Sequence, residues 1–83
     1  MSLRTNRHPC PCCGCITLPE QGQYDICPVC FWEDDPTQSM DEGLEYGANK
    51  VSLKAARKNY LAFGACEEEM LMHVRKPFPE ELI

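Results

Sequence analysis

The chain has 83 residues, seven of them cysteine, and a net charge of −5, which suits one small domain and is too short for two. The acidic balance argues against broad binding to the phosphate backbone of nucleic acids. No stretch approaches the roughly 18 consecutive apolar residues of a membrane span, so we expect no membrane association. A domain of this size buries a modest core, and a metal ion or a disulfide is a common supplement.

Residues 1–9 are polar and contain no apolar run of the kind found in secretory signals. We expect residues 1–8 to be flexible. The number of cysteines is odd, which does not suit a closed disulfide framework. We therefore expect a reducing, cytoplasmic location, where clustered cysteines are more often metal ligands than disulfides.

Two short cysteine motifs predict a metal site. Residues 10–14 read CPCCG and residues 27–30 read CPVC, so each contains a Cys-Pro-x-Cys turn, called a knuckle below. Two residues between ligands let the backbone curl around one ion, so that both sulfurs reach it at about 2.3 Å, and two such turns complete a tetrahedron. Proline stiffens the turn, and glycine after the second cysteine permits a positive φ. The predicted ligands are Cys10, Cys13, Cys27 and Cys30.

An alternative register pairs Cys12 with Cys15, which are also two residues apart. This pair lacks the proline after its first cysteine and the glycine after its second, so we favour Cys10 and Cys13. We expect Cys12 to face out of the knuckle, as a spare thiol, an alternative ligand or a reactive nucleophile, and we favour a packed or half-exposed thiol over a reactive one. Cys15 and Cys66 are expected to serve as small apolar side chains.

Four thiolates suit zinc, and they also suit a single iron ion, as in rubredoxin-like electron carriers. We favour Zn²⁺ because the knuckles are close in sequence and an acidic segment without cysteine follows the second. Four cysteine ligands leave no open position for water, which is typical of structural rather than catalytic sites. The sequence therefore predicts a protein that is not an enzyme. We expect His8 and His73 to be surface residues.

Alternation in residues 16–18 (ITL) and 24–26 (YDI), around the turn residues 19–22 (PEQG), predicts a β-hairpin between the knuckles. Phe31 and Trp32 are expected to pack over the metal turns. Residues 33–45 contain six acids and no base. We interpret them, including the run Glu33 to Asp35, as part of a solvated loop.

The clearest helix is expected to begin after Ser52 as N-cap and to end at Gly64. Its apolar residues share one face and are Leu53, Ala56, Tyr60 and Phe63. A shorter helix is expected over 67–74, and prolines at 77 and 79 indicate an extended tail. The basic residues Lys50, Lys54, Arg57 and Lys58 are interpreted as a solvated face, with nucleic-acid contact as the lesser alternative.

Taken together, these motifs resemble those of the bacterial cysteine-rich CPCC family. The resemblance rests on CPCC (10–13), CPVCFWEDD (27–35), GANKVSLKAARKNYLAFGA (47–65) and HVRKPFPEE (73–81), and it covers nearly everything after residue 8. It implies a small metal-binding domain without an assigned activity.

We therefore predict a small α+β fold, with a zinc-ribbon-like hairpin, two CxxC knuckles and one or two helices. The expected organisation is a single domain (1–83), with the metal site at 9–32, an acidic loop at 33–50, a helical part at 51–76 and an extended tail at 77–83. The predicted function is that of a structural zinc protein that binds an unknown protein partner. The alternatives are a rubredoxin-like redox protein and a nucleic-acid-binding zinc ribbon.

Overall fold

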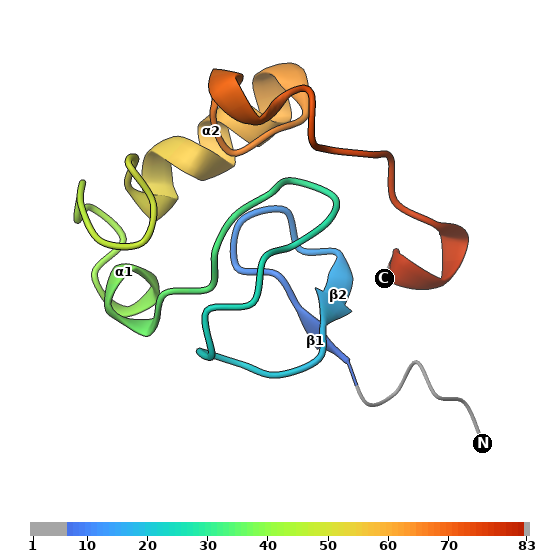
Figure 1. Cartoon of the computed structure of the whole chain (residues 1–83), viewed down its shortest axis with the longest axis horizontal. Coiled ribbons are helices and arrows are strands. Elements are labelled where there is room, and N and C mark those ends of the chain that lie inside the picture. The colour runs from blue at the N-terminus through green and yellow to red at the C-terminus, as the bar shows by residue number, and fades with distance from the viewer. Residues whose placement is uncertain (1–6, 83) are drawn as a thin grey trace.

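The computed structural model describes residues 7–82 (Figure 1). It contains two short strands, β1 (His8–Pro9) and β2 (Ile16–Leu18), and two α-helices, α1 (Pro36–Met40) and α2 (Leu53–Phe63). Two 3₁₀ turns, η2 (Glu68–Met70) and η3 (Pro79–Glu81), complete the regular structure. Most of the segment predicted to be flexible (1–8) lies outside the described residues, but its last residue belongs to β1.

The first knuckle is the loop of a small antiparallel hairpin. β1 pairs with β2, with His8 opposite Leu18 and Pro9 opposite Ile16, and the ladder is irregular between His8 and Pro9. A two-stranded antiparallel hairpin is therefore present, but it surrounds the first knuckle, and the predicted pairing of residues 16–18 with 24–26 was wrong.

Residues 24–26 fold back on the residues that follow the second knuckle. The Tyr24 N–H donates to the Asp34 carbonyl (3.0 Å), the Asp34 N–H donates to the Asp25 carbonyl (2.9 Å), and Ile26 forms a bridge with Glu33. Each knuckle thus closes a hairpin of its own. The alternation in 16–18 and 24–26 does not correspond to alternating burial, because Thr17 and Leu18 are both buried while Tyr24 and Ile26 are both exposed. Alternation alone also does not select a strand's partner.

Helix α2 begins and ends where the sequence predicts. The Ser52 hydroxyl oxygen accepts a hydrogen bond from the Ala55 N–H at 3.0 Å, which satisfies one of the free donors at the helix start. Gly64 is left-handed (φ 89°) and ends the helix with its N–H bonded to the Tyr60 carbonyl. In Figure 1, α2 lies above the loops that contain the knuckles, opposite β1 and β2.

The segment 33–50 is only partly the solvated loop that the sequence suggests, because three of its six acids (Asp41, Glu42 and Glu45) are exposed while two are buried. Asp34 and Asp35 are only 3% and 5% exposed, and α1 begins directly after them. Asp35 caps α1, because its Oδ1 accepts from the Thr37 N–H at 2.8 Å, while its Oδ2 accepts from the Ala48 N–H at 2.9 Å. Buried carboxylates of this kind are retained because backbone N–H groups solvate them in place of water.

A pair of buried amide side chains closes this segment. Gln38 is fully buried, and its Oε1 accepts from the backbone N–H and from the Nδ2 of Asn49 at 3.1 and 2.9 Å. Its Nε2 donates to the Val51 carbonyl at 3.0 Å. Asn49 in turn bonds both backbone groups of Glu33, at 2.9 and 2.8 Å. Side-chain amides therefore replace strand pairing here as partners for the backbone.

The chain after α2 is less regular than predicted. The helix expected over 67–74 is limited to η2 and the turn after it. The Cys66 N–H donates to the Cys30 carbonyl at 2.9 Å, and Glu67 is extended (φ −155°) with no side-chain cap bond. The hydrogen bond between Cys66 and Cys30 and the extended backbone at Glu67 mean that no helix begins before Glu68. The tail expected to be extended includes η3, where Glu81 is buried and bonds Arg75 through both oxygens at 2.8 Å.

The core lies between the knuckles and α2. One cluster of buried apolar side chains includes Leu18, Val29, Trp32, Leu53, Ala56 and six of the cysteines. Trp32 is fully buried, as expected, and Phe31 packs against the cluster while its ring stacks on His73 at 5.0 Å. Among residues 7–82, none of the helices is both long enough and apolar enough to cross a membrane.

Candidate metal centre

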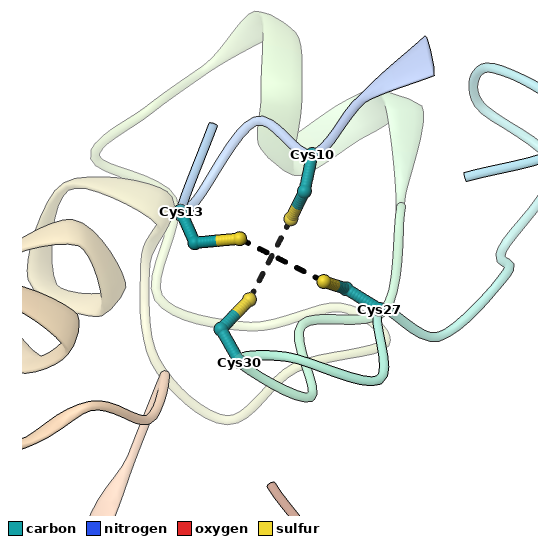
Figure 2. A group of neighbouring side chains, drawn as sticks. All are labelled: Cys10, Cys13, Cys27 and Cys30. Carbon is teal, nitrogen blue, oxygen red and sulfur yellow. Dashed lines mark hydrogen bonds between the residues drawn. The ribbon is translucent and has the colours of Figure 1, made fainter. Parts of the chain in front are cut away.

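The structure brings the four predicted ligands together. The Sγ atoms of Cys10, Cys13, Cys27 and Cys30 all lie within 4.8 Å of one another, and Figure 2 shows the four side chains pointing to a common centre. The Cys10 and Cys30 sulfurs are 3.5 Å apart, and those of Cys13 and Cys27 are 3.7 Å apart. A tetrahedral ion with metal–sulfur distances of about 2.3 Å places its sulfurs about 3.8 Å apart. The donor set therefore fits a four-thiolate metal ion.

The two knuckles have the same backbone conformation. The Cys10 carbonyl accepts from the Gly14 N–H, and the Cys27 carbonyl accepts from the Phe31 N–H, both at 2.8 Å. Gly14 and Phe31 both have a positive φ, of 81° and 70°. Positive φ at Gly14 was predicted and is confirmed. The only sign in the sequence of a positive φ at Phe31 is its position directly after the second cysteine of its knuckle, which corresponds to the position of Gly14.

A second hydrogen bond is also repeated in the two knuckles. The Cys10 N–H donates to the Cys15 carbonyl, and the Cys27 N–H donates to the Trp32 carbonyl, each at 2.9 Å. These bonds close the base of each turn. They help to orient the first cysteine of each pair, so that both turns present their sulfurs to one point.

Two further donors reach the sulfurs. The buried Thr17 hydroxyl donates to the Cys27 Sγ at 3.0 Å, and the Cys15 N–H lies 3.5 Å from the Cys13 Sγ. Such donors orient the ligands and reduce the charge on thiolates. Sequence reasoning missed Thr17, because a polar residue in the middle of an alternating strand suggests a solvent-facing side chain.

The close approach of the four sulfurs changes the acidity of Cys13, Cys27 and Cys30. Hydrogen bonds from Cys10 and Cys13 lower the pKa of Cys27. The interaction with Cys10 raises the pKa values of Cys13 and Cys30. Cys27 therefore ionises more readily than an isolated thiol, whereas Cys13 and Cys30 ionise less readily. A cation at the centre would allow all of them to ionise, since thiols lose their protons on binding metal.

The three remaining cysteines lie outside this cluster. Cys12 is 8% exposed and belongs to the buried core, and its sulfur is not part of the four-cysteine cluster, which agrees with the expectation of a packed thiol rather than a ligand. Cys15 and Cys66 are buried as expected, and burial raises the pKa of Cys66 to about 12. Reactive cysteines are partly exposed, whereas all three of these cysteines are buried.

The other candidate residues contribute no ligand to the cluster. His73 is exposed and His8 is half-buried in β1. In the basic segment, Lys50 lies 3.3 Å from Glu69, and Arg57 lies 2.8 Å from Glu42. Half of that segment's positive charge is therefore matched by acids, as is usual for a solvated face.

Two matching knuckles on a small core, beside one long helix, define a cysteine-rich protein with a single four-cysteine cluster suited to a metal ion. The family model described as Cysteine-rich CPCC matches residues 8–81. The chain belongs to this family, and the resemblance seen in its motifs is confirmed. A search of curated proteins finds no match to the chain.

Proposed function

We propose that the protein is a structural zinc protein that acts as a protein-interaction module. The observation behind this proposal is the convergence of four cysteine sulfurs within 4.8 Å. Four thiolates would fill every position of a tetrahedral zinc ion, which is the arrangement of structural rather than catalytic sites. Each knuckle also stands on its own short hairpin, in the manner of a zinc ribbon.

The position of the cluster supports a structural role. Cys10, Cys27 and Cys30 are buried within the core cluster, next to Trp32 and Leu53. An ion at this place would tie together two segments with few other regular hydrogen bonds. Structural zinc in small domains is worth roughly 10–16 kcal/mol of apparent binding free energy. An 83-residue chain would depend on it for folding.

The surface supports the second half of the proposal. Leu61 on α2 is 86% exposed and Met72 is 83% exposed, so each could contribute an apolar contact to a partner protein. Free thiols in such number suit a reducing compartment, so we place the module in the cytoplasm. The partner is a protein, recognised by the surface rather than by chemistry at the metal.

Two measurements test the proposal. Elemental analysis of protein purified without chelator should find one zinc ion per chain; two ions or none would contradict a single structural site. Partner capture should then be compared between the wild type and Leu61→Glu, with Lys58→Glu as a control at an exposed position of the same helix. Loss of capture with Leu61→Glu alone supports an apolar interface, and equal capture by all three proteins contradicts one at this position.

One observation favours a second candidate, an iron-containing electron carrier. Cys13 is only partly buried, in contrast to the other three cysteines of the cluster, and an exposed ligand edge is a route for electrons. The two candidates differ in colour, because iron–thiolate proteins absorb visible light and zinc–thiolate proteins do not. A coloured preparation that contains one iron ion per chain would identify the metal as iron and favour the electron carrier over the structural zinc protein.

A further inference from the structure

A cavity of about 240 Å³ lies between the first knuckle and α1 and has mainly apolar walls. Pro9 and Pro11, which flank Cys10 in the chain, form one side. Pro36 and Met40, the first and last residues of α1, form another. Proline has a rigid ring and no backbone N–H, so these walls offer fixed apolar surface. None of the lining residues belongs to the four-cysteine cluster.

A buried hydroxyl at this cavity has no hydrogen-bond partner. Ser39 lines the cavity, and its Oγ is buried without a bond to any group in the described part of the chain, residues 7–82. A polar group that is removed from water and left unpaired is costly. The same range contains one other buried side-chain N or O atom without a partner, the Nε1 of Trp32, and Trp32 does not line the cavity.

The hydroxyl of Ser39 is free to turn toward the cavity. The residue as a whole is only half-buried, and no hydrogen bond fixes its Oγ. Rotation about χ1 to another staggered rotamer therefore moves the hydroxyl without breaking a bond. A hydroxyl both donates and accepts, so a ligand hydroxyl can satisfy it in either direction.

The remaining polar groups restrict the charge of the ligand. Asp34 lines the cavity and is 3% exposed, and its Oδ2 accepts from the Gly22 N–H at 2.6 Å. Neither Asp34 oxygen is among the buried atoms without a partner, so this carboxylate does not call for a cation. No lysine, arginine or histidine lines the cavity, so an anion would meet a carboxylate and no positive charge. The unpaired group is neutral, which favours a neutral ligand.

The walls favour an aromatic ring. The thioether of a methionine such as Met40 makes favourable contacts with aromatic rings, and the proline rings add flat apolar surface. Tyrosine combines such a ring with a hydroxyl that needs a partner when it is buried. The N–H of tryptophan only donates, so it matches Ser39 in one direction alone. Tyrosine is also enriched among the residues that contribute most to protein interfaces.

We propose that this cavity binds a tyrosine side chain of the partner protein, with its ring against Pro9, Pro11 and Met40 and its hydroxyl bonded to Ser39. The proposal rests on the proposed interaction function and names a contact that such a module would use. A phosphate on that tyrosine would add about two negative charges next to Asp34. The site should therefore select unmodified tyrosine over phosphotyrosine.

The test uses two blocked amino acids, Nα-acetyl-tyrosine methylamide and the matched phenylalanine compound, which differ by one hydroxyl. Each is added to the metal-loaded protein while backbone amide signals are followed by NMR. We expect saturable shifts at Gly22, Ser39 and Met40 with the tyrosine probe. The phenylalanine probe should bind about three- to tenfold more weakly, as for the loss of one hydrogen bond. Absence of saturable shifts, or equal binding of the two probes, overturns the proposal.

Two charged probes test the expected neutrality of the ligand. The blocked phosphotyrosine compound should not produce saturable shifts at the same residues, because the cavity holds a carboxylate and no cation. The blocked lysine compound should bind more weakly than tyrosine, since an ammonium group cannot accept a bond from Ser39. If either charged probe bound as tightly as tyrosine, the site would not be a tyrosine site.

Substitutions separate the hydroxyl from the walls. In Ser39→Ala the tyrosine and phenylalanine probes should bind equally, because the group that distinguishes them is absent. Met40→Ala should weaken both probes. Met72→Ala is its matched control, because Met40 and Met72 are 88% and 83% exposed and only Met40 lines the cavity. A preference for tyrosine that persists in Ser39→Ala, or equal weakening by the two methionine substitutions, contradicts the site.

Partner capture and probe binding separate the two proposals. If the protein holds its metal and its capture of a partner depends on Leu61, but the tyrosine probe does not bind, then the cavity proposal fails and the interaction module stands. If the tyrosine probe binds with the expected dependence on Ser39, but the chain lacks metal or captures its partner independently of Leu61, the proposed function fails. The cavity then stands as a tyrosine site by itself.

Discussion

The hydroxyl of Thr17 donates a hydrogen bond to the Sγ of Cys27 across 3.0 Å, within the buried part of the cysteine cluster. Cys27 is also the thiol whose pKa the hydrogen bonds from Cys10 and Cys13 lower. β2 thus supplies a donor to the sulfur best suited to hold negative charge. The strand of the first hairpin thereby supports a ligand of the second knuckle.

Removing this donor should weaken metal binding. Thr17→Val keeps the size of the side chain and removes the hydroxyl, so we expect zinc affinity to fall by roughly 10–100-fold, as for other residues that support metal ligands. Competition with a chelator of known affinity measures the change. Thr17→Ser retains the hydroxyl and should recover most of the affinity. An unchanged affinity in Thr17→Val would show that the bond does not support the site.

Single cysteine substitutions distinguish the two registers. Cys13→Ser should lose the metal, because a hydroxyl is a far poorer zinc ligand than a thiolate. Cys12→Ser and Cys15→Ser should keep it, since neither sulfur belongs to the cluster. Zinc content per chain is the measurement. If Cys12→Ser released the metal and Cys13→Ser retained it, the rival pair would be the correct one.

Metal removal should unfold the knuckles. Trp32 is the only tryptophan in the chain and is fully buried beside the cluster. A strong chelator should therefore shift its fluorescence emission to longer wavelength as residues 10–32 become exposed to water. Adding zinc back should reverse the shift. A fluorescence spectrum that stays unchanged after complete metal removal would contradict the structural role of the ion.

The cap of α1 predicts a specific pH dependence. The Ala48 N–H lowers the pKa of Asp35 below its ordinary 3.8, so its charge stabilises the folded state. A lowered folded pKa contributes stability that is fully present above 3.8 and is lost as the pH falls through the lower folded value.

Asp35→Asn keeps an acceptor oxygen and removes the charge. The difference in unfolding free energy between wild type and Asp35→Asn should therefore stay constant at all pH values well above 3.8. Any loss of stability at pH values well above 3.8 should instead be caused by metal release, because the thiols must be deprotonated to bind a metal ion. Denaturant titrations of both proteins at several pH values measure this. If the difference in unfolding free energy between the two proteins decreased together with the metal content, the stabilising role assigned to the Asp35 charge would be refuted.

Gly47 should not tolerate a side chain. It has φ +148°, and a Cβ there would lie 2.6 Å from Asp35 Oδ2 and 3.1 Å from Gln38. Gly47→Ala should destabilise the protein by about 1–3 kcal/mol through backbone strain and overpacking. Gly43→Ala is the matched control, because its Cβ would only approach Asp41 at 4.0 Å. Thermal unfolding compares the two, and equal midpoints would contradict the expected clash.

The sequence alone determined the features that depend on neighbouring residues. Helix α2 (Leu53–Phe63) lies between the caps Ser52 and Gly64, because a cap bond and a left-handed glycine act within a few residues of each helix end. The choice of Cys10 and Cys13 over Cys12 and Cys15 was also local, because proline and glycine shape a turn of five residues. The structure gathers the sulfurs of Cys10 and Cys13 with those of the second knuckle.

Tertiary structure decided everything that depends on distant partners. The strand partner of residues 16–18 depends on where the first knuckle folds back, and alternation does not encode that. Asp34, Asp35 and Gln38 are buried only because residues 22 and 47–51 supply donors and acceptors from elsewhere in the chain. Cys12 is buried because it belongs to the core cluster formed with residues distant in the sequence. A polar residue is predicted to be exposed from its own chemistry, whereas its burial requires partners that only the folded chain provides.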